Sequence, residues 1–503
     1  NHTLGHRFLS QGEVVFAHAD EYADKMRDAG KVIASFADRK AAIQTALNEQ
    51  AGRLNATVAA DEALLDEVAA LVEWPVVLEA GFEAHFLAVP QECLILTMQQ
   101  NQKYFPLLDA SGKLMNRFLL VTNLQTKDPS HIISGNERVL RARLSDAEFF
   151  YKQDQKATLE SRLPKLSQVV YHNKLGNQAE RLNRLMSISG AIAKALGADA
   201  AVAERATRLS KADLVTEMVG EFPELQGTMG KYYARLDGES EEIANAIEQH
   251  YRPRFAGDDL PEGKTATAAA LADKLETLIG IWGIGLIPTG DKDPYALRRS
   301  ALGILRMLMN SDLSISEVLK TAYATFPAGK LADNTVAEVA DFMQARLAVL
   351  LQNDYPQDIV AAVLAQQPDR LNDLTAKLQA VAAFKQLPEA AALAAANKRV
   401  QNLLKKADAE LGAVNESLLQ QAEEQALFAA SQALQPKIAA AVAGNDFQTA
   451  LTELAAIKPQ VDAFFDGVMV MADDAAVKQN RLNLLNQLAN QMNAVADISR
   501  LGE

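Results

Sequence analysis

The sequence predicts a multidomain, mostly α-helical protein whose amino-terminal part is of the mixed α+β type. Its 503 residues are enough for roughly three or four domains. Short segments rich in Val, Phe and Leu occur early in the chain, and from about residue 155 onward the apolar residues recur at helical spacing. From 313 to 503 the chain is rich in Ala, Leu and Gln with that spacing throughout, which predicts one or two all-α bundles.

The composition limits where the protein works and what it binds. A single cysteine, Cys93, excludes an intramolecular disulfide and suits a reducing compartment. No apolar run approaches the roughly 18 residues that a membrane helix needs, and the start of the chain lacks a signal-like apolar core and an initiator Met. We therefore expect a trimmed cytoplasmic chain with no membrane partner. The net charge of −14 argues against broad binding of nucleic acid, DNA included, so any RNA-binding face must be locally basic.

The amino-terminal part alternates between helical and extended segments. We expect charged helices within 11–73, then strands at 73–80, 103–109 and 117–123, because these short runs are rich in Val, Phe and Leu and are bounded by Pro, Gly or Asn. Residues 125–139 contain Pro and Gly among polar residues, which predicts a polar connection. This part of the chain is therefore expected to hold the protein's sheet.

The stretch PTGDKDPYALRR, residues 288–299, is expected to begin a helix. Asp293 is placed as the N-cap and Pro294 as the first helical residue, where its missing N–H costs nothing. An apolar stripe at helical spacing follows, formed by Leu297, Ala301, Ile304, Leu305 and Leu308. The stretch is thus interpreted first as a structural helix start.

Two functional interpretations of this stretch stay open. Arg298 flanks the stripe and Arg299 points away from it, so both are candidates for contact with an RNA backbone. Asp291 and Asp293 are a candidate pair of catalytic carboxylates. A phosphate-binding P-loop is disfavoured because the segment lacks the GxxxxGK[ST] spacing.

The longer segment TGDKDPYALRRSALGILR resembles the signature of the bacterial glycyl-tRNA synthetase β-subunit family. Seven further segments resemble that family in the same order along almost the whole chain: LVEWPVVL, NQKYFPLLDASGKL, ISGNERVLRARLSDAEFFYKQD, LSKADLVTEMVGEFPELQGTMGKYYA, YRPRFAGDDLP, AALAAANKRVQNLL and FFDGVMVMADD. The ordered set is specific where any one segment alone is not. Chains of the family carry a further amino-terminal region, so the resemblance implies a fragment.

The resemblance implies four domains. They are an α+β region at 1–154 similar to part of the substrate-side domains of synthetase β chains, a degenerate HD-like helical domain at 155–312, a helical linker or body at 313–385, and a DALR-like anticodon-binding helical domain at 386–503.

An HD-like domain raises the question of metal chemistry. HD enzymes bind divalent metal through a His, an adjacent His-Asp pair and a later Asp. Here the pair position reads Ala212-Asp213, so one ligand is lost, while His250 and Asp273 remain either as remnants of the set or as structural residues. His172 is a lone histidine with no spaced partner. We therefore expect no metal site, and the alternative function, a metal-dependent HD-type nucleotide phosphohydrolase, is disfavoured by Ala212.

The helix through LAAANKRVQNLLKK separates charge from apolar surface. Lys398, Arg399, Lys405 and Lys406 lie on or beside the face opposite Leu393, Ala396, Val400 and Leu404. Two interpretations stay open, a solvated helix face and a footprint for the tRNA backbone, and the resemblance to DALR domains favours the second.

The aromatic residues of this domain are scarce. Readers of RNA loops stack bases on aromatic rings or Arg planes, and Phe464 and Phe465 are the nearest candidates, although adjacent phenylalanines in an apolar run are more often core. Arg481 falls toward the apolar side of its helix, which favours a structural salt bridge over RNA contact.

A second basic region surrounds the expected sheet, with Lys103, Arg117, Arg138, Arg141 and Arg143. Arg138 and Arg141 could pair with Asp146 or Glu148 on the same helix. A salt-bridged helix face and a tRNA contact are both retained.

The function implied by the resemblance is that of the tRNA-binding β subunit of a glycine–tRNA ligase, which positions tRNA(Gly) for ATP-dependent glycylation at an active site on a separate α subunit. ATP and Mg would be used by the holoenzyme, a heterotetramer of two α and two β subunits, with no cofactor and no catalytic residue on this chain. The sequence agrees in lacking the motifs of a class II catalytic core. A purely structural helical scaffold is a third reading, which tRNA binding would exclude.

Overall fold

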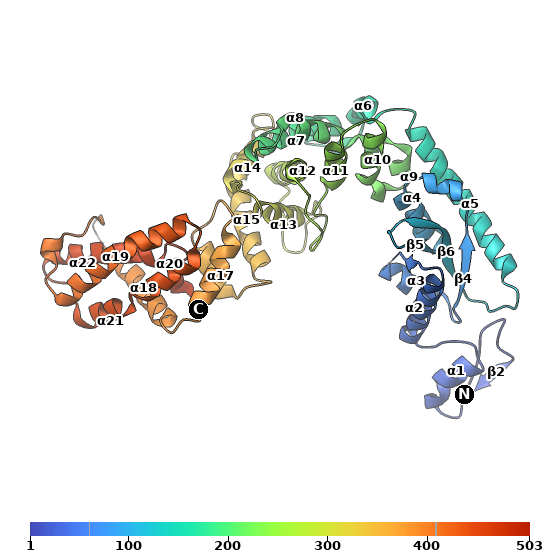
Figure 1. Ribbon diagram of the computed structural model, residues 1–503, viewed down its shortest axis with the longest axis horizontal. Coiled ribbons are helices and arrows are strands. Elements are labelled where there is room, and N and C mark those ends of the chain that lie inside the picture. The colour runs from blue at the N-terminus through green and yellow to red at the C-terminus, as the bar shows by residue number, and fades with distance from the viewer. Residues whose placement is uncertain (60, 408–409, 503) are drawn as a thin grey trace. The chain divides into compact units, whose positions relative to one another are not determined.

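The computed structural model describes residues 1–59, 61–407 and 410–502, and helices dominate them (Figure 1). The chain forms two compact units. Unit 1 comprises Asn1–Val169 and Leu209–Glu248, and unit 2 comprises Val170–Arg208 and Gln249–Glu503. None of the described helices is long and apolar enough to cross a membrane.

Unit 1 contains the sheet that the sequence predicts. Four antiparallel strands lie in the order β3 (Thr57–Val58), β5 (Phe105–Leu108), β6 (Leu114–Thr122) and β4 (Val76–Gly81). The three expected strands are confirmed, with Leu78 opposite Leu120 and Phe105 opposite Leu119. The hairpin β1 (His2–Leu4) with β2 (Glu13–Val15) was not expected, because three-residue strands are too short to show alternation.

Two helices cover this sheet. α2 (Phe36–Arg53) contacts β3, β4 and β6, and α3 (Glu62–Leu71) packs on α2. The side chains of Ser35 and Asp61 cap their amino ends by accepting hydrogen bonds from the backbone N–H groups of Asp38 and Leu64. The buried residues of this layer include Ile43, Leu47, Val68, Val77, Phe105 and Leu119.

The predicted polar connection at 125–139 is partly wrong. α5 (Ser130–Asp154) begins directly after Pro129, and the Asp128 carboxylate accepts a hydrogen bond from the Ser130 N–H at 3.0 Å. Gly135 lies inside the helix without breaking it, because the buried face of Leu140 and Leu144 holds the helix against the unit.

Residues 209–248, the second segment of unit 1, are hydrogen-bonded to a buried carboxylate at the end of α5. Asp154 accepts hydrogen bonds from the N–H groups of Glu217 and Met218, at 2.8 and 3.0 Å, and from the Tyr233 hydroxyl at 2.5 Å. These residues belong to α9 (Glu217–Glu221) and α10 (Thr228–Leu236). The remaining helices wholly within unit 1 are α1 (Tyr22–Asp28), α4 (Gln91–Leu96) and α6 (Leu159–Arg162).

Unit 2 is built around α12 (Lys264–Gly283), which contacts α7 (Gln178–Ala195), α13 (Leu297–Leu308), α14 (Ile315–Tyr323) and α15 (Thr335–Leu351). Its many alanines, among them Ala268, Ala269, Ala270 and Ala272, are buried and let these neighbours approach closely. A short hairpin, β7 (Val170–His172) with β8 (Gly176–Asn177), precedes α7. α8 (Ala200–Leu209) and α11 (Glu241–Gln249) complete the middle of the chain.

The start of α13 differs from the prediction. The helix begins at Leu297, because Ala296 adopts a left-handed conformation with φ of 53°, and Pro294 lies in the preceding turn. Asp293 is therefore not the N-cap residue by position. Its carboxylate still accepts hydrogen bonds from the N–H groups of Leu297 and Arg298, at 2.8 and 3.0 Å, and so performs the capping role from further back.

The carboxy-terminal part is all-α, as predicted, and between 313 and 502 the described residues contain no strand. Its helices are α16 (Gln357–Leu364), α17 (Leu374–Lys385), α18 (Ala390–Leu404), α19 (Ala422–Ala443), α20 (Phe447–Ala455), α21 (Lys458–Gly467) and α22 (Ala475–Met492). One cluster of buried apolar side chains runs through unit 2, from Leu175 to Ile498.

Candidate nucleic-acid interface

The basic residues of α18 lie where the sequence predicts. Lys398, Arg399, Lys405 and Lys406 are exposed, although α18 ends at Leu404 and the last two follow it. The opposite side of the helix buries Leu393, Ala394, Asn397 and Val400. Arg399, Lys405 and Lys406 form no ion pair with any residue in the described ranges. Their charges are available to a ligand.

One of these cations lies over an aromatic ring. The Arg399 guanidinium lies 4.4 Å from the centroid of the Phe465 ring, which is half-buried on α21. The adjacent Phe464 is fully buried and meets Phe465 edge-on. The expectation of a core position is therefore confirmed for Phe464, whereas Phe465 packs against the same core only partly buried, because consecutive residues of a helix point about 100° apart. We call Arg399 and Phe465 the cationic platform.

The segment after α21 also exposes unusual side chains. Met469 is 74% exposed and Met471 is 44% exposed, in the connection between α21 and α22. Arg481 donates from Nη1 to the Met469 carbonyl at 2.7 Å and forms a buried ion pair with Glu424. Its structural interpretation is thus confirmed, and it fixes the backbone of the methionine-bearing segment.

Two asparagines of α22 were missed by sequence reasoning. Asn480 exchanges hydrogen bonds with the backbone of Asn415 at 2.7 and 2.9 Å, and Asn483 accepts from Gly412 N at 2.9 Å and donates to the Ala413 carbonyl at 3.0 Å. They hold the connection after α18 against α22. The available signal was a pair of buried amides three residues apart on an otherwise apolar helix face.

The arginines of α5 do not pair as expected. Arg141 pairs with Glu83 outside the helix, and Glu148 pairs with Lys152 at 3.2 Å, so pairing of Arg138 or Arg141 with Asp146 or Glu148 is wrong. Arg138 and Arg143 are exposed and form no ion pair within the described residues. The expected surface of salt bridges is therefore only partly formed.

The other predicted basic residues are mostly engaged locally. Lys103 pairs with Glu67 at 3.0 Å, and Arg117 pairs with Glu79. Arg298 donates from Nη2 to the Gly290 carbonyl at 2.6 Å, which ties it to its own loop, while Arg299 is exposed. Of the arginine pair in this segment, Arg299 is the better placed for an external contact.

The residues considered as remnants of an HD metal site have structural partners. Asp213 is buried beside Ala212 in unit 1, where it accepts hydrogen bonds from Gly227 N at 2.6 Å and Gly230 N at 2.9 Å. Burial raises the pKa of Asp213 to about 6. His250, in unit 2, directly follows α11 and is buried against the Tyr251 ring. Within the described residues, no group of three or more His, Cys, Asp or Glu side chains could hold a metal ion.

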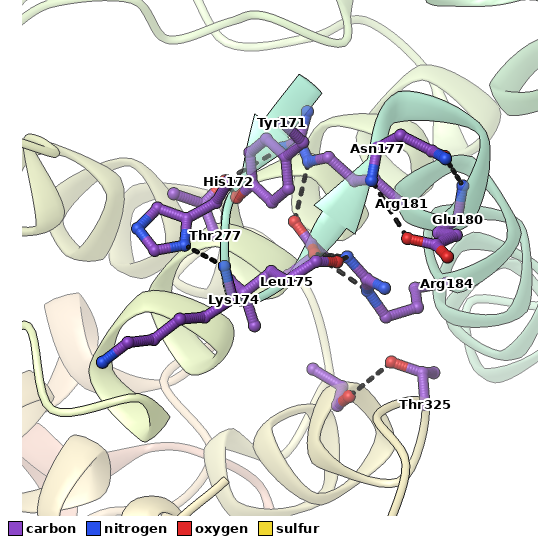
Figure 2. A network of polar contacts seen from close by, with 12 residues as sticks. Tyr171, His172, Lys174, Leu175, Asn177, Glu180, Arg181, Arg184, Thr277 and Thr325 are labelled. Carbon is purple, nitrogen blue, oxygen red and sulfur yellow. Dashed lines mark hydrogen bonds and ion pairs between the residues drawn. The ribbon is translucent and has the colours of Figure 1, made fainter. Parts of the chain in front are cut away.

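Asp273, the last of these residues, belongs to a buried polar network in unit 2, of which Figure 2 shows Arg181, Arg184 and Thr277. Arg181 donates to Asp273 Oδ1 at 3.1 Å and to Glu276 Oε2 at 2.8 Å, and Arg184 donates to Glu276 Oε1 at 3.0 Å. Burial lowers the pKa of Arg181, but the carboxylates of Asp273 and Glu276 outweigh it and raise that pKa well above its usual value. Asp273 is thus a hydrogen-bonded structural residue of α12, which is one of the two interpretations that the sequence left open.

The hairpin beside this network is held in a fixed conformation. Arg184 donates from Nη2 to the Leu175 carbonyl at 3.1 Å, and His172 Nδ1 accepts from Lys174 N at 3.1 Å. The side chains of Asn177 and Glu180 form a capping box at the start of α7. The lone His172 therefore has a structural role in the turn.

A helical module with an exposed arginine over an aromatic ring and lysines nearby is a surface suited to an RNA loop. Comparison with known families agrees, since residues 393–498 match the DALR anticodon binding domain. Residues 1–365 match the model described as the glycyl-tRNA synthetase beta subunit.

Close relatives extend this likeness to the whole chain. A glycine–tRNA ligase beta subunit of Neisseria meningitidis serogroup B is 82% identical over 503 residues, covering 100% of this chain and 73% of the relative. The beta subunits of Neisseria gonorrhoeae and Ralstonia nicotianae are 83% and 57% identical, with 100% of this chain covered and 73% and 72% of the relatives. The chain belongs to the glycyl-tRNA synthetase β-subunit family, and so is a subunit of an aminoacyl-tRNA synthetase.

Proposed function

We propose that this chain binds tRNA(Gly) and positions it for ATP-dependent glycylation at the active site of a separate α subunit. In this proposal ATP and Mg act through the α subunit, and the cytoplasmic holoenzyme contains two α and two β subunits. The observation that carries the proposal is the cationic platform, flanked by Lys398, Lys405 and Lys406 within the DALR match.

The platform suits a loop nucleotide. Unstacked RNA bases bind on aromatic rings and guanidinium planes, and such stacking contributes about 1–3 kcal/mol per base. The neighbouring lysines suit the backbone phosphates on either side of such a base, because they are exposed and their charges neutralise a polyanion. Arg299 is proposed as a further backbone contact, and Arg298 as the residue that holds its loop.

The test separates charge from stacking. Replacing Lys405 and Lys406 by Gln should flatten the logarithmic salt dependence of tRNA binding by about 0.7–0.9 per lost phosphate contact, and should affect cognate and noncognate tRNA alike. Replacing Arg399 by Lys keeps the positive charge but removes the planar guanidinium on which a base can stack. The affinity for tRNA should therefore fall, while the salt dependence of binding should change little. Gln at Lys437 and Lys458, on α19 and α21 of the same module, is the control for positive charge lost elsewhere in the module, where these lysines pair with Glu453 and Asp462.

Further neutralisation of Lys398 and Arg399 gives the full quadruple variant. Its tRNA affinity should fall while the melting temperature stays within about two degrees of the parent, because none of the four side chains is buried. If the quadruple variant binds both tRNAs as tightly as the parent at every salt concentration, this face is merely solvated and the proposal for it is wrong.

Nothing in the described residues favours the alternative HD phosphohydrolase. The Asp213 carboxylate accepts hydrogen bonds from two backbone N–H groups, and the Asp273 carboxylate accepts one from Arg181. Elemental analysis of the purified protein tests this directly. One equivalent of Mn, Fe or Zn, lost in Asp213→Asn or Asp273→Asn, would support the alternative.

A further inference from the structure

A polar cavity of unit 2 lies outside the DALR match. It has a volume of about 830 Å³, and its lining comes from the β7–β8 hairpin, α7 and the segment that follows α14. This size is typical of a site that encloses a small ligand or one or two nucleotide units. Figure 2 shows Arg184 on the α7 side and Thr325 opposite it.

The floor of this cavity holds a buried cation with an unused donor. Arg184 is 9% exposed and lies over the Phe326 ring at 4.7 Å. Its Nε donates to Glu276 and its Nη2 to the Leu175 carbonyl, whereas its Nη1 has no acceptor among the residues that the structure describes. Since Arg184 lines the cavity, a ligand with acceptor oxygens would complete its hydrogen bonds.

The rim adds two lysines. Lys174 and Lys330 line the cavity, are exposed, and form no ion pair with a described residue. Glu180 is the only carboxylate in the described lining, and its Oε2 accepts a hydrogen bond from Asn177 N at 3.0 Å. The cavity is therefore locally cationic in a chain whose net charge is −14.

Neutral groups complete the lining. The amides of Asn173 and Asn183 and the hydroxyl of Ser187 are exposed and make no hydrogen bond within the described parts of the chain. Uncommitted amides beside cations match a sugar–phosphate backbone, which offers both anionic oxygens and 2′-hydroxyl groups.

We propose that this cavity is a second tRNA-binding site, in which Lys174, Lys330 and Arg184 bind backbone phosphate of the RNA. It rests on the proposed tRNA binding but uses residues separate from the anticodon module. Free nucleotide or inorganic phosphate carries the same chemistry, and the experiment below distinguishes these sources.

The test uses the chain assembled with its α subunit. In K174Q/K330Q the logarithmic salt slope of tRNA binding should fall by about 1.4–1.8, because two phosphate contacts are lost. K194Q/K320Q removes the same charge from exposed positions of α7 and α14 that do not line the cavity, and its slope should equal that of the parent. Asn183→Asp should weaken tRNA binding by placing a carboxylate in the cavity, and Asn183→Ala should weaken it less, because it removes the amide without adding a charge.

Three results would overturn the proposal. The first is a salt slope of tRNA binding that is equal in K174Q/K330Q and K194Q/K320Q, while K405Q/K406Q still weakens tRNA binding. This result would exclude the cavity as a tRNA site and would leave the proposal for the anticodon module standing. The second is stoichiometric binding of ATP or inorganic phosphate that K174Q/K330Q abolishes without changing tRNA binding. The third is loss of α-subunit association in K174Q/K330Q without RNA, which would assign the cavity to a protein partner. Absence of tRNA binding by the parent assembly would instead overturn the proposed function, and this site with it.

Discussion

Glu276 is the residue on which the buried network of unit 2 depends. It is fully buried and accepts hydrogen bonds from both Arg181 and Arg184. Glu276→Gln would leave two buried guanidinium groups with one remaining carboxylate, Asp273, so we expect a loss of about 3–5 kcal/mol in the free energy of unfolding. Chemical denaturation measures this.

The matched control is Glu453→Gln, which breaks a surface pair with Lys437 at 3.3 Å and should cost no more than about 1 kcal/mol. Equal losses in the two variants would mean that the buried network contributes no more than a surface ion pair.

Asp213 gives unit 1 a pH-dependent stability. Its folded-state pKa is raised to about 6 from an ordinary value of 3.8, so between those values the folded state holds a proton that the unfolded state has released. The parent should therefore lose stability as the pH rises from 4 to 6, and no more from this group above 6. Asp213→Asn removes the titrating group, so the stability of the variant should not change with pH through this position. The free energy of unfolding of the variant minus that of the parent should therefore rise by on the order of 2–3 kcal/mol between pH 4 and 7. A difference that is constant with pH would contradict this assignment.

At the residue scale the sequence predicts which charged side chains are exposed better than it predicts which residues they contact. The exposure of Lys398 and Arg399 follows from the helical wheel, and the burial of Phe464 follows from its apolar run. The contact of Arg399 with Phe465 and the pairing of Arg141 with Glu83 join residues far apart in the chain. Periodicity places a side chain on a face of its own helix but says nothing of what that face meets.

At the scale of elements, the β7–β8 hairpin depends on Gly176. Its φ is +95°, and a Cβ at this position would lie 1.6 Å from the Glu180 carboxylate that caps α7. Gly176→Ala should lower stability by more than about 1 kcal/mol and weaken tRNA binding through the cavity that the hairpin lines. Gly135→Ala is the control, because it lies within α5 with open space around its Cβ position and should stabilise the protein by about 0.4–1 kcal/mol. A Gly176→Ala variant as stable as the parent would mean that the hairpin rearranges freely.

The elements themselves were largely predictable. β4, β5 and β6 follow from short runs rich in Val, Phe and Leu, and the all-α character beyond 313 follows from apolar residues at helical spacing. The start of α13 was not predictable, because the left-handed conformation of Ala296 is imposed by the turn before it and is not a preference of alanine. The two-residue β8 escapes any test of periodicity for the same reason as the other short strands, since alternation needs several residues.

For the whole molecule we expect no glycine activation by this chain alone. Purified chain should give no glycine-dependent exchange of pyrophosphate into ATP, because its sequence supplies no class II catalytic core, and addition of the α subunit should produce the exchange. Robust exchange by the chain alone would overturn the division of labour between the subunits.

The two-unit division of the molecule could not be predicted from the sequence. Composition changes gradually from 155 to 312, yet residues 170–208 join one unit and 209–248 the other. The four domains expected from the family resemblance stay a prediction. They divide the chain by its similarity to other proteins, whereas the two units divide it by contacts within the structure.

The hydrogen bonds of Asp154 have a consequence for biosynthesis. The carboxylate at the end of α5 accepts hydrogen bonds from Glu217, Met218 and Tyr233, and residues 170–208, which are synthesised before these donors, belong to the other unit. A nascent chain leaving the ribosome therefore carries most of unit 1 in an unfinished form while part of unit 2 is already being made. An expression fragment that stops at Val169 would keep the ion pair of Asp154 with Arg162, at 3.8 Å, but would lose the three hydrogen-bond donors that 209–248 supplies, whereas splicing 209–248 directly after residue 169 would restore them.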